Sequence, residues 1–391
     1  MIPLSEPLLN GNEWAYLKEC LDTNWVSSAG PFVERFEREI IRQVRVPNAV
    51  ALASGTAALH LALIAAGVGA GDYVLVSDLT FVAPVNAIRY VGAIPILVDA
   101  DPDTWQMDHE LVAQKLSTET ELKAEGCYWP AGDGYIKAML PVHILGGACE
   151  MERLQQLAGQ YQMVLIEDAS EALGCIHDGK PCGSWGDMGV LSFNGNKIIT
   201  SGGGGMFLSQ ESQFAERVKH LSTQAKTDAL RYVHDEVGYN YRLSNLHAAM
   251  GLAQLEQLAG FVLQRRQKAE QYQARLADIS DIQFQKHEPF CQPNHWLFSI
   301  LHPHKEGLMA HLIEHGIGCR AIWAPMHQLP MYQDASLWQR QDAPTNTPQS
   351  ARIANNGLSL PSSASLSEEQ LDFVCSQIEA FSEAGPITQE G

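Results

Sequence analysis

The chain has 391 residues, which is long enough for two domains and a large buried site. Its formal net charge of −19 argues against general affinity for nucleic acid or for an anionic membrane, because both bind basic surfaces. A hydrophobic content of 46% and a charged content of 18% are those of an ordinary globular protein, and no apolar run reaches the length of a membrane-spanning helix.

The amino terminus, Met1-Ile2-Pro3-Leu4-Ser5-Glu6, has neither the basic start nor the apolar stretch of a secretory signal, so we expect a cytoplasmic protein. The eight cysteines are scattered and form no CxxC pair, and we expect them to be reduced packing residues. The 14 histidines include no HExxH motif, so we expect no metal centre.

From about residue 48, short apolar runs alternate with amphipathic stretches, which predicts the strands and helices of an α/β fold. Predicted strands cover residues 48–53, 73–77, 94–98, 138–143, 163–167, 190–193 and 205–208. Predicted helices cover residues 56–66, 82–91, 108–116 and 150–160. Gly67 ends the first helix, and the last two strands pair around a glycine run.

After residue 245 the pattern changes. A single long helix is predicted over 247–276, and a smaller unit follows it. In that unit we predict strands over 298–301 and 318–322, helices over 305–315 and 367–381, and a polar loop over 333–349. We therefore expect a large domain of residues 1–250 and a small C-terminal domain of residues 251–391.

One lysine, Lys197, lies between the strand end at Ser192 and the glycine run 202–205. A lysine amine attacks a carbonyl only when it is unprotonated, so a Schiff-base lysine must be partly desolvated or lie near other positive charge. Glycines nearby let the backbone approach a bulky cofactor. Taken alone, the segment also fits a surface lysine before a flexible hairpin.

Two strand ends carry further polar groups. Ser54-Gly55-Thr56-Ala57 lies between a strand and a helix, so its amides converge as in a phosphate site, although an ordinary helix cap has the same sequence. Glu167 and Asp168 close another strand, and Asp168 should face the ligand crevice while Glu167 faces away. A carboxylate there would keep a pyridine nitrogen protonated. Glu171 fits either the site or a helix start.

Two other segments suit a bound ring and its phosphate. Phe81 follows the strand 73–77 and can stack on a cofactor ring, although an aromatic residue there is also a common core residue. The loop 238–245 is polar and aromatic, and its Asn240 and Arg242 carry donors suited to phosphate or carboxylate. Helix entry capped by Ser244 is the alternative.

Together these segments resemble the DegT/DnrJ/EryC1/StrS family of sugar aminotransferases, which use pyridoxal 5'-phosphate (PLP). The matching segments are residues 25–30 with Phe36-Glu37, SGTAAL at 54–59, EDASEALG at 167–174, SFNGNK at 192–197 and GYNYRLSNLHAAMGLAQL at 238–255. The resemblance implies an aspartate aminotransferase-like α/β fold (PLP fold type I), with a large mixed-sheet domain and a smaller C-terminal α/β domain. It also implies a homodimer whose active sites lie at the subunit interface.

Carried onto this sequence, the resemblance makes Lys197 the Schiff-base lysine, Asp168 the partner of the pyridine nitrogen and Phe81 the stacking residue. The phosphate positions of the family correspond to Gly55, Thr56, Ser192 and, from the partner subunit, Asn240. Segments that line the substrate side in relatives contain Trp25, Arg320 and His327. Packing, a surface ion pair and a structural hydrogen bond are the respective alternatives for these three.

Many relatives have glutamine where this chain has Glu171. That departure resembles a subgroup that makes 4-amino sugars for bacillosamine and legionaminic acid. The implied reaction moves the amino group of L-glutamate to C4 of a nucleotide-linked 4-keto-6-deoxyhexose in bacterial surface-glycan biosynthesis. The expected substrate is UDP-2-acetamido-2,6-dideoxy-4-hexulose.

Three alternatives remain. The first is a 3-keto sugar aminotransferase of the same family. The second is a family dehydratase, in which histidine replaces the lysine, and Lys197 argues against it. The third is a regulatory protein that keeps the PLP fold without turnover.

Overall fold

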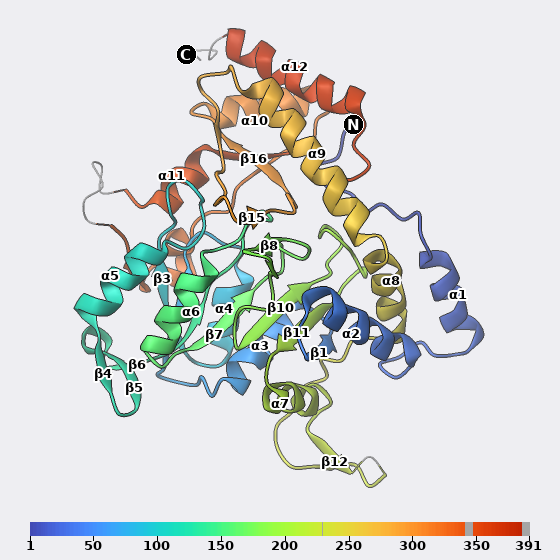
Figure 1. The fold of residues 1–391 in the computed structure, drawn as a ribbon, viewed down its shortest axis with the longest axis vertical. Coiled ribbons are helices and arrows are strands. Elements are labelled where there is room, and N and C mark those ends of the chain that lie inside the picture. Colours follow the sequence, from blue (N-terminus) through green and yellow to red (C-terminus); the bar gives the residue numbers. More distant parts are fainter. Residues whose placement is uncertain (229, 341–346, 385–391) are drawn as a thin grey trace.

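The computed structural model describes residues 1–228, 230–340 and 347–384 (Figure 1). A large mixed sheet fills the centre of the molecule, and a smaller antiparallel sheet with its helices lies at the top of the view in Figure 1. The α/β prediction with a large mixed sheet is therefore confirmed.

The large sheet runs in the order β1-β11-β10-β7-β6-β2-β3-β18, with β5 and then β4 joined to β6. From β10 to β18 neighbouring strands are parallel, whereas β11 is antiparallel to both β1 and β10. Its strands are β1 Asn48–Leu52, β2 Tyr73–Ser77, β3 Ile94–Val98, β4 Glu121–Lys123, β5 Gly126–Trp129, β6 Gly134–Leu140, β7 Val164–Asp168, β10 Met188–Ser192, β11 Gly205–Ser209 and β18 Ser336–Trp338. The predicted strand pair around the glycine run is thus confirmed.

Helices cover both faces of the large sheet. Along β2, Val74 and Val76 pack with residues of α3 and α4, whereas Leu75 packs with α5 and α6 on the other face. This alternation follows from the period of two in a strand. The helices of this part are α1 Glu13–Asp22, α2 Pro31–Val44, α3 Gly55–Ala65, α4 Ala83–Tyr90, α5 His109–Glu119, α6 Met151–Gln160, α7 Ser212–Ser222 and α8 Asn245–Leu255.

The smaller sheet is antiparallel, in the order β14-β16-β19-β17, and packs its apolar side chains against three helices. Its strands are β14 Gln283–Phe284, β16 Phe298–Leu301, β17 Arg320–Ala321 and β19 Gly357–Leu360. The helices that cover it are α9 Leu258–Leu276, α10 Lys305–Glu314 and α12 Glu368–Ala384. Helix α11 spans Gln349–Asn356.

Two short sheets complete the fold. Strands β8 Ile176–His177, β9 Lys180–Pro181 and β15 Cys291–Gln292 join a loop of the large sheet to the segment before β16. Strands β12 Lys226–Asp228 and β13 Val233–His234 form a hairpin that projects at the bottom of Figure 1.

The prediction of one long helix over 247–276 is wrong, because α8 and α9 are separate helices. The break falls at Glu256 and Gln257. Near it, the side-chain amides of Gln254 and Gln257 both donate to the Glu13 carboxylate on α1. This contact comes from a segment more than 200 residues away, so helical periodicity alone could not reveal it.

The predicted loop over 333–349 is also wrong in part, because residues 336–338 form β18 and pair in parallel with β3. A three-residue strand has too few positions to show alternation, and its partner lies far away in the sequence. Residues 341–346 of the predicted loop lie outside the described residues. Since β18 joins the large sheet from the C-terminal part of the chain, the division near residue 250 stays a prediction.

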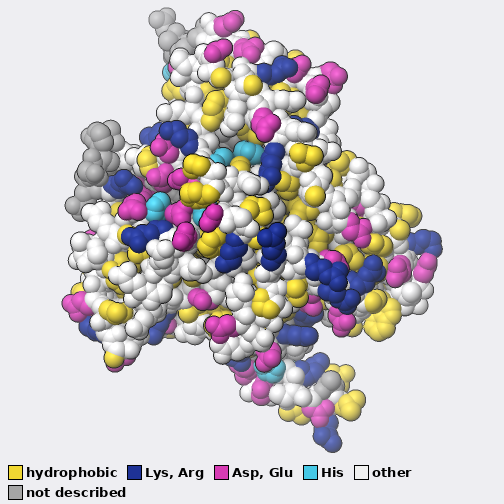
Figure 2. Space-filling view, in the orientation of Figure 1, with side chains coloured by type: hydrophobic (Ala, Val, Ile, Leu, Met, Phe, Trp, Pro, Cys, Tyr) yellow, Lys and Arg dark blue, Asp and Glu magenta, His cyan; other side chains and the backbone are white. Residues whose placement is uncertain are grey.

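The surface carries both signs of charge despite the net charge of −19. Figure 2 shows Lys and Arg side chains gathered over α2, which carries Arg35, Arg38 and Arg42. In the part of the chain that the structure describes, no helix has both the length and the apolar character needed to cross a membrane.

Candidate active site

A cavity of about 420 Å³ lies where the carboxyl ends of β7 and β10 meet the start of α3. This is the edge at which open α/β sheets bind ligands. Residues from both parts of the chain line it, among them Gly55, Thr56, Phe81, Asp168, Glu171, Ser192, Lys197, Trp296, Arg320 and Trp323.

Lys197 points its amino group at two neighbours in the cavity. Nζ lies 3.2 Å from Glu171 Oε1, and it lies 4.1 Å from the centre of the Trp296 ring. The Lys197 and Glu171 side chains are only 13% and 5% exposed, so the pair is largely withdrawn from water. Burial raises the pKa of Glu171, and the positive charge of Lys197 opposes that rise.

The second oxygen of Glu171 is also used. Oε2 accepts a hydrogen bond of 2.9 Å from the backbone N–H of Leu145. Glu171 therefore joins the lysine to the loop after β6, and of its two predicted roles the structure places it in the cavity rather than at a helix start.

Asp168 ends β7 and is 3% exposed at the cavity. Its Oδ1 accepts a hydrogen bond from the Ser170 N–H, and burial raises the pKa of its carboxyl group. A buried carboxylate with few donors favours a cationic partner in front of it.

Glu167 does not line the cavity and contacts His143 instead, as the alternation of the strand predicts. Its carboxylate accepts hydrogen bonds from His143 Nε2 and from the backbone N–H groups of Gly183, Trp185 and Gly186. Burial alone would raise the Glu167 pKa, but these donors bring it below its ordinary value. Glu167 thus anchors the face of β7 that is opposite to the cavity, and Asp168 lies on the cavity side of the same strand.

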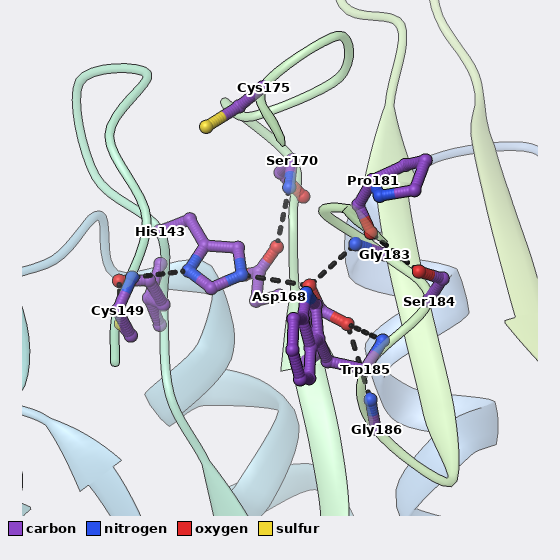
Figure 3. Close-up of polar contacts among 12 residues, drawn as sticks. His143, Cys149, Asp168, Ser170, Cys175, Pro181, Gly183, Ser184, Trp185 and Gly186 are labelled. Atoms are coloured by element: carbon purple, nitrogen blue, oxygen red, sulfur yellow. Dashed lines mark hydrogen bonds and ion pairs between the residues drawn. The ribbon is translucent and has the colours of Figure 1, made fainter. Parts of the chain in front are cut away.

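The backbone N–H of Cys149 decides which ring nitrogen of His143 donates a hydrogen bond. Its Nδ1 accepts the N–H of Cys149, so Nε2 carries the proton that it donates to Glu167 (Figure 3). Cys182 lies close by, and the three ligand atoms of His143, Glu167 and Cys182 lie within 4.8 Å of one another. The four N–H donors already satisfy the Glu167 carboxylate without a metal ion.

The start of α3 supplies free amides to the cavity. Ser54 Oγ accepts the Ala57 N–H at 3.0 Å, so Ser54 is the helix cap. The N–H groups of Gly55 and Thr56 belong to the first turn of the helix, which has no helical acceptors. Ser54 therefore caps the helix, as one of the two interpretations predicts, whereas the binding of a phosphate by the next two amides stays a prediction.

The glycine run lies directly behind this turn. A Cβ atom at Gly205 would lie 2.4 Å from the Ser54 carbonyl carbon and 2.5 Å from the Gly55 nitrogen. Residue 205 must therefore be glycine for β11 to pack against the turn. Gly203 and Gly204 line the cavity itself.

These residues fit PLP. Thr80 Oγ1 is buried and lacks a hydrogen-bond partner among the described residues, although Thr80 lines the cavity. A ligand with polar substituents would satisfy it. The amides at the start of α3 suit the phosphate, Asp168 suits a protonated ring nitrogen, and the Lys197 amine suits the aldehyde.

Three predicted residues lie outside this cavity lining. Trp25 is 49% exposed, and its carbonyl accepts from Asn245 Nδ2. Asn240 is exposed, and its Oδ1 accepts from Gln224 Nε2. His327 Nδ1 lies 2.6 Å from Asp78 Oδ2, which raises the His327 pKa. Phe81 and Arg320 line the cavity as expected.

Trp296 is a cavity residue that the sequence did not indicate. It lies just before β16, and its Nε1 donates to the carbonyl of Asn196 at 2.6 Å. These two residues are 100 positions apart in the sequence. A lone tryptophan before a predicted strand reads as a core residue, so no local signal connects it with Lys197.

Comparison with known proteins identifies the family. The chain matches the DegT/DnrJ/EryC1/StrS aminotransferase family over residues 7–379. It is 37% identical to the GDP-perosamine synthase of Escherichia coli O157:H7 over 97% of this chain and 98% of that protein. It is also 37% identical to the GDP-perosamine synthase of Vibrio cholerae, over 97% of this chain and 99% of that protein.

Among solved structures, a DegT DnrJ EryC1 StrS aminotransferase from Brucella abortus superimposes with a TM-score of 0.86 at 27% identity, over 95% of each chain. The chain therefore belongs to the DegT/DnrJ/EryC1/StrS aminotransferase family. It has the PLP fold type I, and it is a PLP-dependent sugar aminotransferase.

Proposed function

We propose that this member of the family transfers the amino group of L-glutamate to C4 of a nucleotide-linked 4-keto-6-deoxyhexose. The observation that carries the proposal is the placing of Lys197 Nζ 3.2 Å from Glu171, in a cavity that Asp168 also lines. When bound, PLP supplies an electron sink for the carbon that loses its proton. The two substrates react in turn at the same site.

In this mechanism Lys197 Nζ would take the proton from the α-carbon of glutamate in the first half of the reaction. In the second half it would deliver a proton to the sugar carbon that receives the amino group. Glu171 orients that amino group through its direct contact. Asp168 holds a proton on the ring nitrogen by its negative charge. Gly55, Thr56 and Ser192 would bind the phosphate, and Phe81 would stack on the ring.

The substrate residues are also proposals. Arg320 lines the cavity and offers a cation to an anionic group of either substrate. The backbone N–H and the Nδ1 atom of His327 both contact the carboxylate of Asp78, the residue after β2. His327 would therefore act on the substrate side by holding the turn that follows β2.

Trp25 and Asn240 would serve the cavity of a second copy in a homodimer. The segments around Trp25 expose the large apolar side chains of Trp14, Leu21 and Val26. Such a surface suits burial against a partner. In this arrangement Asn240 reaches the phosphate from the partner subunit, and the two active sites lie at the interface.

Two sugars are candidates. The sequence segments around Lys197 and Glu171 favour UDP-2-acetamido-2,6-dideoxy-4-hexulose. The similarity to two GDP-perosamine synthases favours a GDP-linked 4-keto-6-deoxy sugar instead, because perosamine is a 4-amino sugar. Both candidates place the new amino group at C4.

The test is incubation of the purified protein with glutamate and a panel of UDP-, GDP- and dTDP-linked 4-keto and 3-keto sugars, with product analysis by NMR. We expect a C4 amine from a UDP- or GDP-linked substrate. Amination only of 3-keto sugars would refute the C4 assignment. If glutamate left the bound cofactor unchanged, the assignment of L-glutamate as the amino donor would be refuted.

A further inference from the structure

Trp296 contacts Lys197 in two ways. The Lys197 Nζ atom lies 4.1 Å from the centre of the indole ring, a distance at which the ring face attracts a cation. The indole Nε1 donates to the carbonyl of Asn196, the residue before the lysine, at 2.6 Å. Trp296 is 3% exposed, so both contacts are sheltered from water.

Trp296 is itself held from behind by two polar side chains. Its backbone N–H donates to Asn294 Oδ1 at 2.8 Å, and its carbonyl accepts from Arg265 Nη1 at 2.7 Å. Arg265 is 3% exposed on α9 and also donates to the carbonyl of Ser362. The backbone of Trp296 is therefore fixed between α9 and the loop after β19.

The side-chain amide of Asn294 also connects Trp296 with Glu171. Asn294 Nδ2 donates to the carbonyls of Glu171 and Leu173, each at 2.9 Å. The space around Asn294 is fully used, because a Cβ atom at Gly146 would lie only 2.0 Å from Asn294 Oδ1. The two groups that contact the lysine amine are thus tied to each other through Asn294.

We propose that Trp296 is a positioning residue for Lys197. Trp296 and Glu171 together form what we call the lysine seat, which holds the lysine amino group whenever that group is free. A lysine side chain carries about 2 kcal/mol of rotamer entropy, so an unheld amine would sample many positions between proton transfers. The inference rests on the proposed role of Lys197.

The test compares Trp296→Leu and Trp296→Phe with a matched control, Trp338→Phe. Trp338 is 2% exposed, lies on β18 outside the cavity lining, and its Nε1 has no partner among the described residues. The control therefore creates a similar cavity without touching the seat. Trp296→Phe keeps a ring face but loses the bond to Asn196, whereas Trp296→Leu loses both.

The first readout is chemical. Excess glutamate converts the holoenzyme to its pyridoxamine phosphate form, in which the Lys197 amine is free, and acetic anhydride then labels amines. Mass spectrometry gives the labelling rate of Lys197 relative to exposed Lys18. We expect Trp296→Leu to raise this ratio about two- to fivefold, because that factor corresponds to the loss of one cation–π contact. Trp338→Phe leaves it unchanged.

The second readout is turnover. We expect kcat to fall roughly a hundredfold in Trp296→Leu and about tenfold in Trp296→Phe, because a misplaced catalytic group reacts slowly. The KM for glutamate should change little, since Trp296 acts through the lysine. If Trp296→Leu and Trp338→Phe had the same labelling ratio of Lys197 to Lys18 and the same kcat, the proposal of the lysine seat would be overturned.

A fall in kcat and in Tm without a change in labelling would also overturn it, because Trp296 would then act only on the fold. Lys197→Ala separates this inference from the proposed function. If Lys197→Ala retained full activity, the proposed mechanism itself would fail, whatever the Trp296 variants showed.

Discussion

Replacing Glu167 with glutamine should destabilise the protein strongly, because the geometry leaves no good orientation for an amide. Oε1 accepts from His143 Nε2 and Gly183 N–H, and Oε2 accepts from Trp185 and Gly186 N–H. A glutamine has one acceptor oxygen, so either orientation turns its NH₂ group toward two N–H donors. Each unsatisfied buried donor costs about 1–3 kcal/mol, which predicts a loss of about 2–6 kcal/mol in the free energy of unfolding.

The neighbouring carboxylate gives the matched comparison. Burial raises the Asp168 pKa, so the folded state favours the protonated carboxyl group. The stability that this group contributes is complete below the unfolded pKa and is lost as pH rises through the folded pKa. At pH 7 the cofactor-free Asp168→Asn variant should therefore be at least as stable as the wild type. Its kcat should nevertheless fall roughly 10²–10³-fold, because the charge that faces the ring is lost.

The assay is urea unfolding of the cofactor-free proteins at pH 7, together with steady-state turnover of the holoenzymes. The Glu167 pKa is lowered, so its stabilisation is present above the unfolded pKa and is lost as pH falls through the folded pKa. The difference in the free energy of unfolding between wild type and Glu167→Gln should therefore become smaller at acidic pH. A loss below about 0.5 kcal/mol, the range of an ordinary surface substitution, would refute the reasoning.

Lys197→Ala should abolish turnover and the visible absorbance of PLP bound through the lysine, and retained activity would contradict the assignment. Ser54→Ala removes the acceptor of the Ala57 N–H, so it should cost about 1 kcal/mol in urea unfolding and weaken PLP binding in equilibrium dialysis; unchanged values would exclude the cap. The Asp78 contact raises the His327 pKa above 6.5, so its stabilisation is complete below that pH and fades as pH rises through the folded pKa. His327→Gln should therefore lower Tm more at pH 5.5 than at pH 8.5, and an equal change at both would disprove the link.

Much of the site follows from local patterns. The bounds of β2 and β3 agree with the predicted strands, since both are continuous apolar runs buried on two faces. The opposite orientation of Glu167 and Asp168 follows from strand alternation alone. The approach of Lys197 to the carboxyl edge of the sheet follows from its place after β10.

The rest depends on contacts between distant segments. Strand β18 exists because β3 offers it a free edge, and the break before α9 coincides with contacts to Glu13. Trp296 reaches the lysine only because the C-terminal part of the chain folds over the sheet. Periodicity describes neighbours within about two turns or a few strand positions, so it carries no information on these pairs.

The pairing of β18 with β3 has a consequence for any shortened chain. A fragment that ended at residue 250 would lack Ser336–Trp338 and would leave unpaired the edge of β3 that faces β18 along Ile96–Val98. An unpaired, apolar strand edge is a template for intermolecular association. The fragment of residues 1–250 alone should therefore aggregate on expression, and in the whole chain β18 protects this strand edge from intermolecular pairing.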